Sequence, residues 1–91
     1  MMDDGLTSWR ELFISRMAFN GETLADVISN TMSEQEMDVR FYSSFGGVEG
    51  IPFTVWTTNN VYFPACCDGS EWVGSVSRNP DGKATDHIGN D

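Results

Sequence analysis

The stretch Phe53-Thr54-Val55-Trp56-Thr57-Thr58-Asn59-Asn60-Val61-Tyr62-Phe63 decides the fold class of this chain. Residues 53–57 and 61–63 are rich in β-branched and aromatic side chains, a composition typical of strands. Asn59 and Asn60 favour a tight turn between them, because asparagine tolerates a positive φ. The stretch therefore predicts an antiparallel β-hairpin.

A third strand is expected over residues 71–77. Asp68-Gly69 marks a turn before this strand, and Asn79-Pro80-Asp81-Gly82 is a turn sequence that ends it. Together with the hairpin it predicts a three-stranded antiparallel β-meander over about residues 52–78. The remaining residues, 79–91, form a polar tail without a periodic pattern, which we expect to be ordered only where it touches the sheet.

A helix is predicted from Ser8 onward, before the first of these strands. Ser8 and Glu11 have the spacing of a capping box. The apolar residues that follow share one helical face, and Gly21 is suited to end the helix. These apolar residues are Trp9, Leu12, Phe13 and Met17.

Two further short helices are expected in the same half of the chain, which we place at about residues 8–43. One covers residues 23–30, and the other begins at Ser33, where Glu36 completes a second capping box. The sequence thus predicts a single α+β domain over residues 1–91. In this predicted domain, about three short N-terminal helices pack on a C-terminal three-stranded antiparallel β-meander.

The predicted sheet places large side chains on both of its faces, because successive strand residues point to opposite sides. One face is needed for the helices. The other keeps aromatic residues that either pack under the glycine-rich loop of residues 46–50 or under the tail, or form an exposed contact patch. Under the second alternative Tyr62 and Trp72 are candidate binding anchors, since buried aromatic side chains carry much of the energy of interfaces.

The chain is strongly acidic for its length of 91 residues. Fourteen Asp and Glu stand against five Lys and Arg, which gives a formal net charge of -9, and 12% of the residues are aromatic. With that many aromatic residues the charge belongs to a folded surface, which repels nucleic acid and anionic membranes and attracts basic proteins. The densest acidic positions are either a solvated face or an anionic patch that docks onto a basic groove. They are Glu22, Asp26, Glu34, Glu36 and Asp38.

The sequence gives little support to catalysis or metal binding. Cys66 and Cys67 are adjacent, and His87 is the single histidine. Three such residues fall short of a structural zinc site, so we expect no metal, no cofactor and no catalytic residue. A small enzyme that uses one of the cysteines with His87 is kept as a weaker alternative. No stretch is apolar enough to span a bilayer and no secretory signal opens the chain, which favours a cytoplasmic protein.

Several segments of the chain resemble a group of small uncharacterised proteins of tailed bacteriophages and prophages. The hairpin region is the most specific part of the resemblance, and the group provides no catalytic motif to transfer. The segments are Pro52–Thr57, Val61–Pro64, Asp68–Val73, Ser77–Pro80, Ser8–Leu12 and His87–Gly89. The resemblance implies a phage origin, and small acidic phage proteins are similar in kind to anti-CRISPR proteins.

These observations together favour a phage-encoded inhibitor of a host defence system, which we expect to be an anti-CRISPR protein. It would bind a host protein with a basic nucleic-acid-binding groove, such as a CRISPR effector subunit, in the cytoplasm of an infected bacterium. Its acidic and aromatic residues would then block access of DNA, without any direct contact with nucleic acid or membrane. The alternative is a phage structural or assembly accessory protein.

Overall fold

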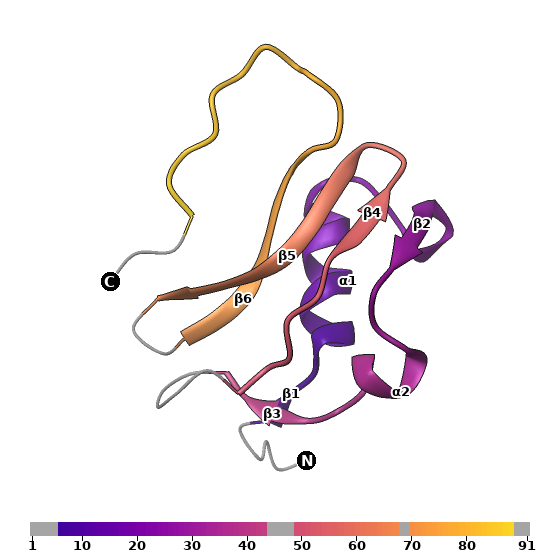
Figure 1. Cartoon of the computed structure of the whole chain (residues 1–91), viewed down its shortest axis with the longest axis vertical. Coiled ribbons are helices and arrows are strands. Elements are labelled where there is room, and N and C mark those ends of the chain that lie inside the picture. The colour runs from indigo at the N-terminus through magenta and orange to yellow at the C-terminus, as the bar shows by residue number, and fades with distance from the viewer. Residues whose placement is uncertain (1–5, 44–48, 68–69, 89–91) are drawn as a thin grey trace.

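The computed structural model describes residues 6–43, 49–67 and 70–88 as an α+β fold with two antiparallel sheets. Figure 1 shows the elements in chain order. They are β1 (Leu6–Thr7), α1 (Trp9–Phe19), the 3₁₀ turn η1 (Leu24–Asp26), β2 (Val27–Asn30), α2 (Glu34–Met37), β3 (Phe41–Tyr42), β4 (Val55–Thr57), β5 (Asn60–Cys67) and β6 (Ser70–Ser77). The expected turn at Asp68-Gly69 and most of the glycine-rich loop lie outside the described residues.

The larger sheet has the strand order β2-β4-β5-β6, and all neighbours are antiparallel. It contains the predicted meander, which is therefore confirmed, and adds β2 at one edge. The hairpin turn is Thr58-Asn59, one residue earlier than expected, because β5 already begins at Asn60. Pro64, which has no N–H group, is accommodated in β5 because β4 pairs with this strand only at Val61 and Tyr62.

The first predicted helix is confirmed as α1. The hydroxyl oxygen of Ser8 accepts a hydrogen bond of 3.3 Å from the backbone N–H of Glu11 and so caps its first turn. Gly21 follows the helix with a φ of 76°, a conformation that glycine adopts at little cost. The apolar face of α1 is buried at Trp9, Phe13 and Met17.

The other two predicted helices are largely wrong. Residues 24–26 form only the single turn η1, and residues 27–30 form strand β2, because Val27–Asn30 pairs with β4. The third helix is the single turn α2, whose predicted capping box between Ser33 and Glu36 is present. Phe41 does not continue that helix and instead lies in β3, which pairs with β1.

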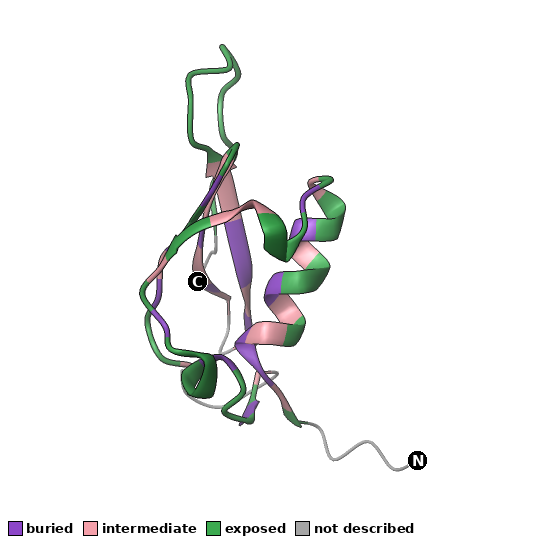
Figure 2. Cartoon of the chain, turned by 90° about the vertical axis from the view of Figure 1, so that its right-hand side faces the viewer, coloured by how far each residue is buried: buried purple, intermediate pink, exposed green. Residues whose placement is uncertain are grey.

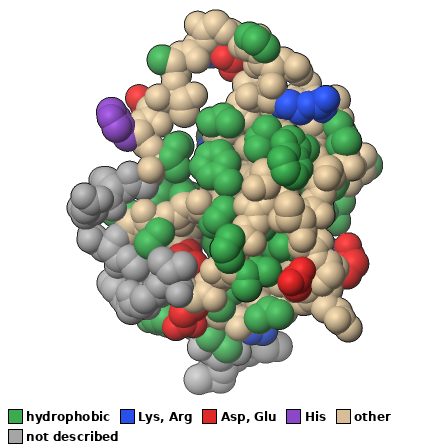
Figure 3. Space-filling model, in the orientation of Figure 1, with side chains coloured by type: hydrophobic (Ala, Val, Ile, Leu, Met, Phe, Trp, Pro, Cys, Tyr) green, Lys and Arg blue, Asp and Glu red, His purple; other side chains and the backbone are tan. Residues whose placement is uncertain are grey.

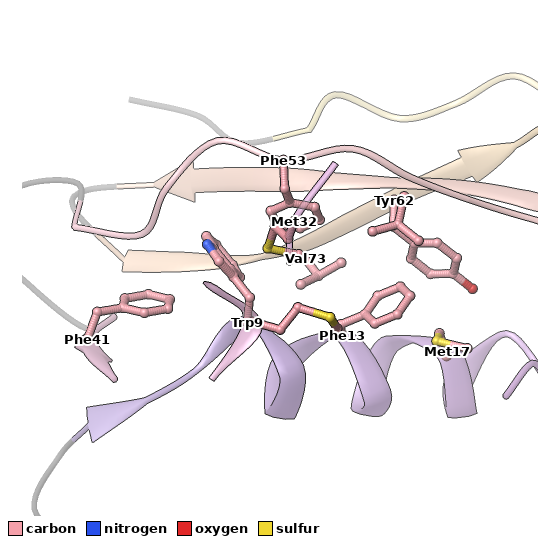
Figure 4. Packing of buried hydrophobic residues seen from close by; sticks show 10 residues of the cluster. Trp9, Phe13, Met17, Met32, Phe41, Phe53, Tyr62 and Val73 are labelled. Atoms are coloured by element: carbon pink, nitrogen blue, oxygen red, sulfur yellow. The ribbon is translucent and has the colours of Figure 1, made fainter. Parts of the chain in front are cut away.

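The core lies between α1 and one face of the larger sheet, as Figures 2 and 4 show. The indole Nε1 of Trp9 donates a hydrogen bond of 2.9 Å to the carbonyl oxygen of Ile51. The rings of Phe13 and Tyr62 meet edge to face at 5.0 Å. The remaining residues of this buried cluster come from both halves of the chain: Met17, Met32, Met37, Phe41, Phe53, Val55 and Val73. The helices and strands therefore share one core.

The opposite face of the sheet is partly open. Hydrophobic side chains gather over this face in Figure 3, and Trp56 keeps 36% of its surface exposed. A Cβ atom at Gly74 would lie 2.7 Å from the ring of Phe63 and 3.3 Å from Ile88, so these two side chains lie over Gly74. The tail thus covers one part of the face through Ile88 and leaves Trp56 in contact with solvent.

No helix among the described residues is long and apolar enough to cross a membrane.

Candidate functional site

Glu22 and Tyr62, two of the predicted contact residues, lie inside the protein. Tyr62 has 0% of its surface exposed and Glu22 has 6%. The expectation that they lie on the surface and contact a partner is therefore wrong. Glu22 lies just beyond Asn20 and Gly21, which follow α1, and residues of β4 and β5 donate hydrogen bonds to it.

The carboxylate of Glu22 accepts hydrogen bonds from the β4–β5 hairpin through both of its oxygens. Its Oε1 accepts from the hydroxyl groups of Thr57 and Tyr62, each at 2.7 Å, and from the side-chain amide of Asn60 at 3.0 Å. Its Oε2 accepts from the backbone N–H of Asn59 at 3.1 Å. Burial raises the pKa of Glu22, but these hydrogen bonds together lower it more, and the net pKa lies below its ordinary value. The buried acid is therefore a charged structural anchor.

Tyr62 is held as a neutral donor in this network. Burial, and then the hydrogen bond to Glu22, raise the pKa of Tyr62 to about 12. On its other side, the side-chain amide of Asn20 donates to the Tyr62 oxygen at 3.2 Å and to the hydroxyl oxygen of Ser75 at 3.1 Å. The end of α1 is thus hydrogen-bonded to two strands of the sheet.

Glu34, Glu36 and Asp38, which we call the acidic cluster, are exposed around the single turn α2. Arg10 of α1 joins two of them: its Nη2 lies 2.6 Å from Glu34 Oε1, and its Nε lies 2.6 Å from Asp38 Oδ1. The hydrogen bonds to Asp38 and Glu34 raise the pKa of Arg10 above its already high ordinary value, so the guanidinium stays charged. Two of the three carboxylates are thus paired with one cation at the surface.

Two of the predicted acids also cap short turns. The carboxylate of Glu36 accepts a hydrogen bond of 2.8 Å from the backbone N–H of Ser33. The carboxylate of Asp26 accepts a hydrogen bond of 2.9 Å from the backbone N–H of Thr23. Asp26 is half-buried and lies in η1, not in α2. The structure therefore brings together Glu34, Glu36 and Asp38 of the five predicted anionic contacts.

An apolar groove of about 440 Å³ lies between α1 and η1. Its apolar lining residues are Ile14, Met17, Ala18, Leu24 and Ala25. Leu24 is 47% exposed and also lines a neighbouring cleft together with Arg10 and Glu34. The exposed apolar residue Leu24 therefore connects the apolar groove to a cleft that Glu34 of the acidic cluster also lines.

Trp72, the second predicted aromatic anchor, lies at a different groove. This edge groove, of about 300 Å³, is formed between α1 and β6. It is lined by Leu12, Ser15, Arg16, Phe19, Trp72 and Val73. Phe19 is 78% exposed, and the guanidinium carbon of Arg16 lies 5.0 Å from the centre of its ring.

The two grooves flank opposite sides of α1. With 3.6 residues per turn, Arg10 and Ile14 share one side of the helix, whereas Leu12, Ser15 and Phe19 share the other. The structure therefore does not combine Trp72 and the acidic cluster into one surface. Ile14, Leu24 and Phe19 were not among the predicted contact residues, although a helical projection of residues 9–19 places Ile14 and Phe19 outside the buried stripe.

The residues considered for catalysis or metal binding are placed as follows. Cys66 and Cys67 are half-buried free thiols in β5, and His87 lies in the exposed segment that follows β6. In the described ranges, no group of three or more His, Cys, Asp or Glu side chains could hold a metal ion.

Comparisons with known proteins add no relative. No family model matches the chain, and neither a curated protein nor a solved structure is significantly similar to it.

Proposed function

We propose that this protein acts by binding a basic, nucleic-acid-binding surface of another protein and thereby blocks access of DNA. The observation that carries the proposal is the position of Leu24 between an apolar groove and a charged cleft. This exposed residue lines the apolar groove and, together with Arg10 and Glu34, the cleft beside it. Carboxylates beside exposed apolar side chains are suited to a partner surface that combines Lys or Arg with apolar groups.

Electrostatics and apolar burial have different roles in this proposal. The formal net charge of -9 attracts a basic partner over distance and speeds the encounter. The carboxylates of the acidic cluster then occupy positions that phosphate groups would take on that partner. Leu24 and Ile14 supply contact area that excludes water, which strengthens the charged contacts around it.

The biological setting rests on the resemblance to small proteins of tailed bacteriophages. A phage protein that blocks a DNA-binding surface of its host is an inhibitor of host defence, and a CRISPR effector is the target we propose. That step is an analogy of size, charge and origin. It defines the first set of partners to test.

The test measures DNA binding by a panel of purified CRISPR effector complexes in a mobility-shift assay, with and without the protein. We expect inhibition of at least one effector. The triple variant Glu34→Gln, Glu36→Gln, Asp38→Asn should weaken inhibition by at least about ten-fold. Gln at position 36 keeps the capping-box interaction, so the fold of α2 is preserved.

A matched control changes the same amount of charge elsewhere on the exposed surface. It combines Glu49→Gln, Asp81→Asn and Asp86→Asn, and should retain inhibition. Equal losses in both variants would show that total charge alone matters and would contradict the assigned surface. Association with phage particles, with no effect on any effector, would contradict the inhibitor proposal itself.

A further inference from the structure

Strand β6 ends the larger sheet, and its outer edge is regular enough to accept another strand. The backbone N–H of Arg78 donates to the carbonyl oxygen of Asn59 at 2.9 Å, just beyond the ends of β5 and β6. Because hydrogen-bonded pairs alternate along an antiparallel ladder, Val76, Gly74 and Trp72 bond to β5. The residues between them therefore direct their backbone groups away from β5.

One hydrogen bond confirms that direction. The backbone N–H of Glu71 donates to the carbonyl oxygen of Ser43 at 2.7 Å on the outer side of β6. The next outward-facing positions are Val73 and Ser75. No other described segment forms a backbone hydrogen bond with these two residues on that side. Their N–H and C=O groups are thus in position to pair with an added strand.

The edge groove lies beside these backbone groups. Helix α1 supplies Leu12, Ser15 and Phe19 to one wall, and β6 supplies Trp72 and Val73 to the other. A strand added to β6 would lie alongside α1, and its side chains would point alternately toward α1 and toward the opposite face of the sheet. This arrangement, a sheet edge flanked by a helix, is suited to binding an extended peptide by strand addition.

Over residues 72–77 this edge lacks the usual protection against pairing, although Glu71 near its start is a buried charge. Exposed edge strands of soluble proteins commonly carry Lys, Pro or inward-pointing charges that prevent association. Residues 72–77 read Trp-Val-Gly-Ser-Val-Ser and contain neither a charge nor a proline. Six consecutive residues without a charge or a proline favour an edge that pairs with an added strand.

The net charge of the protein favours one kind of segment as the partner of the β6 edge. Arg16 is the single charged residue of the groove lining, and its Nε is hydrogen-bonded to Ser75 Oγ at 3.1 Å. Beyond the groove, an approaching segment meets a molecule whose formal net charge is -9. A second copy would be repelled by the same charge, whereas a basic segment would be attracted.

We infer that the β6 edge groove binds an extended segment of a partner protein, with β-branched side chains against Trp72 and Phe19 and with flanking Lys or Arg. The segment pairs with the backbone of Val73 and Ser75. This inference does not depend on the acidic cluster, which lies on the other side of α1.

The probe is a synthetic peptide of alternating Val and Thr flanked by Lys, titrated into the isotope-labelled protein. Nuclear magnetic resonance should show the largest amide shifts at Val73 and Ser75. A peptide of the same core flanked by Glu should bind about ten-fold more weakly. N-methylation of the alternate peptide amides that face β6 should abolish binding, and N-methylation of the other amides should be tolerated.

The variant Ser15→Trp fills the groove from an exposed helical position and should weaken peptide binding by at least about ten-fold. Gln35→Trp, on the exposed surface of α2, is the matched control and should have no effect. Shifts away from β6, equal binding of both peptides, or normal binding by Ser15→Trp would overturn the inference. So would a homodimer in sedimentation that Ser15→Trp dissociates. Because Ser15→Trp leaves the acidic cluster intact, it separates this inference from the proposed function.

Discussion

The hydroxyl group of Tyr62 donates a hydrogen bond of 2.7 Å to Oε1 of Glu22, and both side chains are buried. Glu22 follows the C-terminal end of α1, and Tyr62 is in the central strand β5, so this bond joins the helix to the sheet. A buried carboxylate is costly unless its oxygens are well hydrogen-bonded. In this protein the donors converge on Glu22 from the β4–β5 hairpin, and the interaction makes the packing of helix on hairpin specific.

The substitution Tyr62→Phe should destabilise the protein by about 1.5–3 kcal/mol, the range for a hydrogen bond to a charged group. The phenyl ring keeps the edge-to-face contact with Phe13, so the loss reports the hydrogen bond. Urea denaturation followed by fluorescence measures it. Tyr42→Phe is the matched control on an exposed tyrosine and should change stability by less than about 0.5 kcal/mol. Equal effects of the two substitutions would contradict the anchoring role of Glu22.

Stability should fall at acidic pH in a way that depends on Glu22. The folded state lowers the pKa of this carboxyl group below its unfolded value of about 4.3. Folding is therefore favoured by the charged form, and this stabilisation is complete above the unfolded pKa. It is lost as the pH falls through the folded pKa. Urea denaturation at a series of pH values should show this loss in the wild-type protein.

The variant Glu22→Gln is the control for that pH dependence. It should be less stable at neutral pH by about 1–3 kcal/mol, because an amide cannot accept all of the donors that converge there. Its stability should also change less between neutral and acidic pH than that of the wild-type protein. If both proteins lose the same stability on acidification, another group controls the transition.

The parts of the fold that were predicted correctly depend on local sequence signals. Each of these signals depends only on residues that are close in the sequence. They are the helix cap at Ser8, the helix end at Gly21 and the turn after Thr57. Strand β2 was missed because the apolar pair Val27 and Ile28 fits either a helix or a strand when the segment is short. These residues form a strand because they pair with β4, which is distant in sequence.

The candidate site was harder to predict for the same reason. In the sequence, Glu22 resembles any other carboxylate on a helical face, and its burial depends on donors in residues 57–62. Tyr62 and Trp72 both alternate with apolar residues in strands, but one points into the core and the other lies beside α1. The choice between the two sheet faces depends on where α1 packs, which no local pattern specifies.

Gly50 should not tolerate a side chain. A Cβ atom there would collide with Cζ2 of Trp9, whose ring is buried and hydrogen-bonded to Ile51. We expect Gly50→Ala to destabilise the protein by about 1–3 kcal/mol, as overpacking does. Thermal or urea denaturation measures this loss. In a Trp9→Phe background, which removes the contacting ring atoms, the same substitution should cost less, and strict additivity would contradict the steric explanation.

Removal of Arg10 should change binding more than stability. Its ion pairs with Glu34 and Asp38 lie at the surface, where such pairs contribute about 0–1 kcal/mol, so Arg10→Gln should remain folded. The substitution leaves those carboxylates without their cation, and affinity for a basic probe such as oligolysine should rise by about three-fold at low salt. Calorimetric titration at two salt concentrations measures the change, which should shrink at high salt. Arg78→Gln alters the total charge equally but lies on the β4–β5 hairpin side, where its Nη1 donates to Thr57. If Arg78→Gln strengthens binding as much as Arg10→Gln does, the probe senses the net charge of the protein and not the acidic cluster.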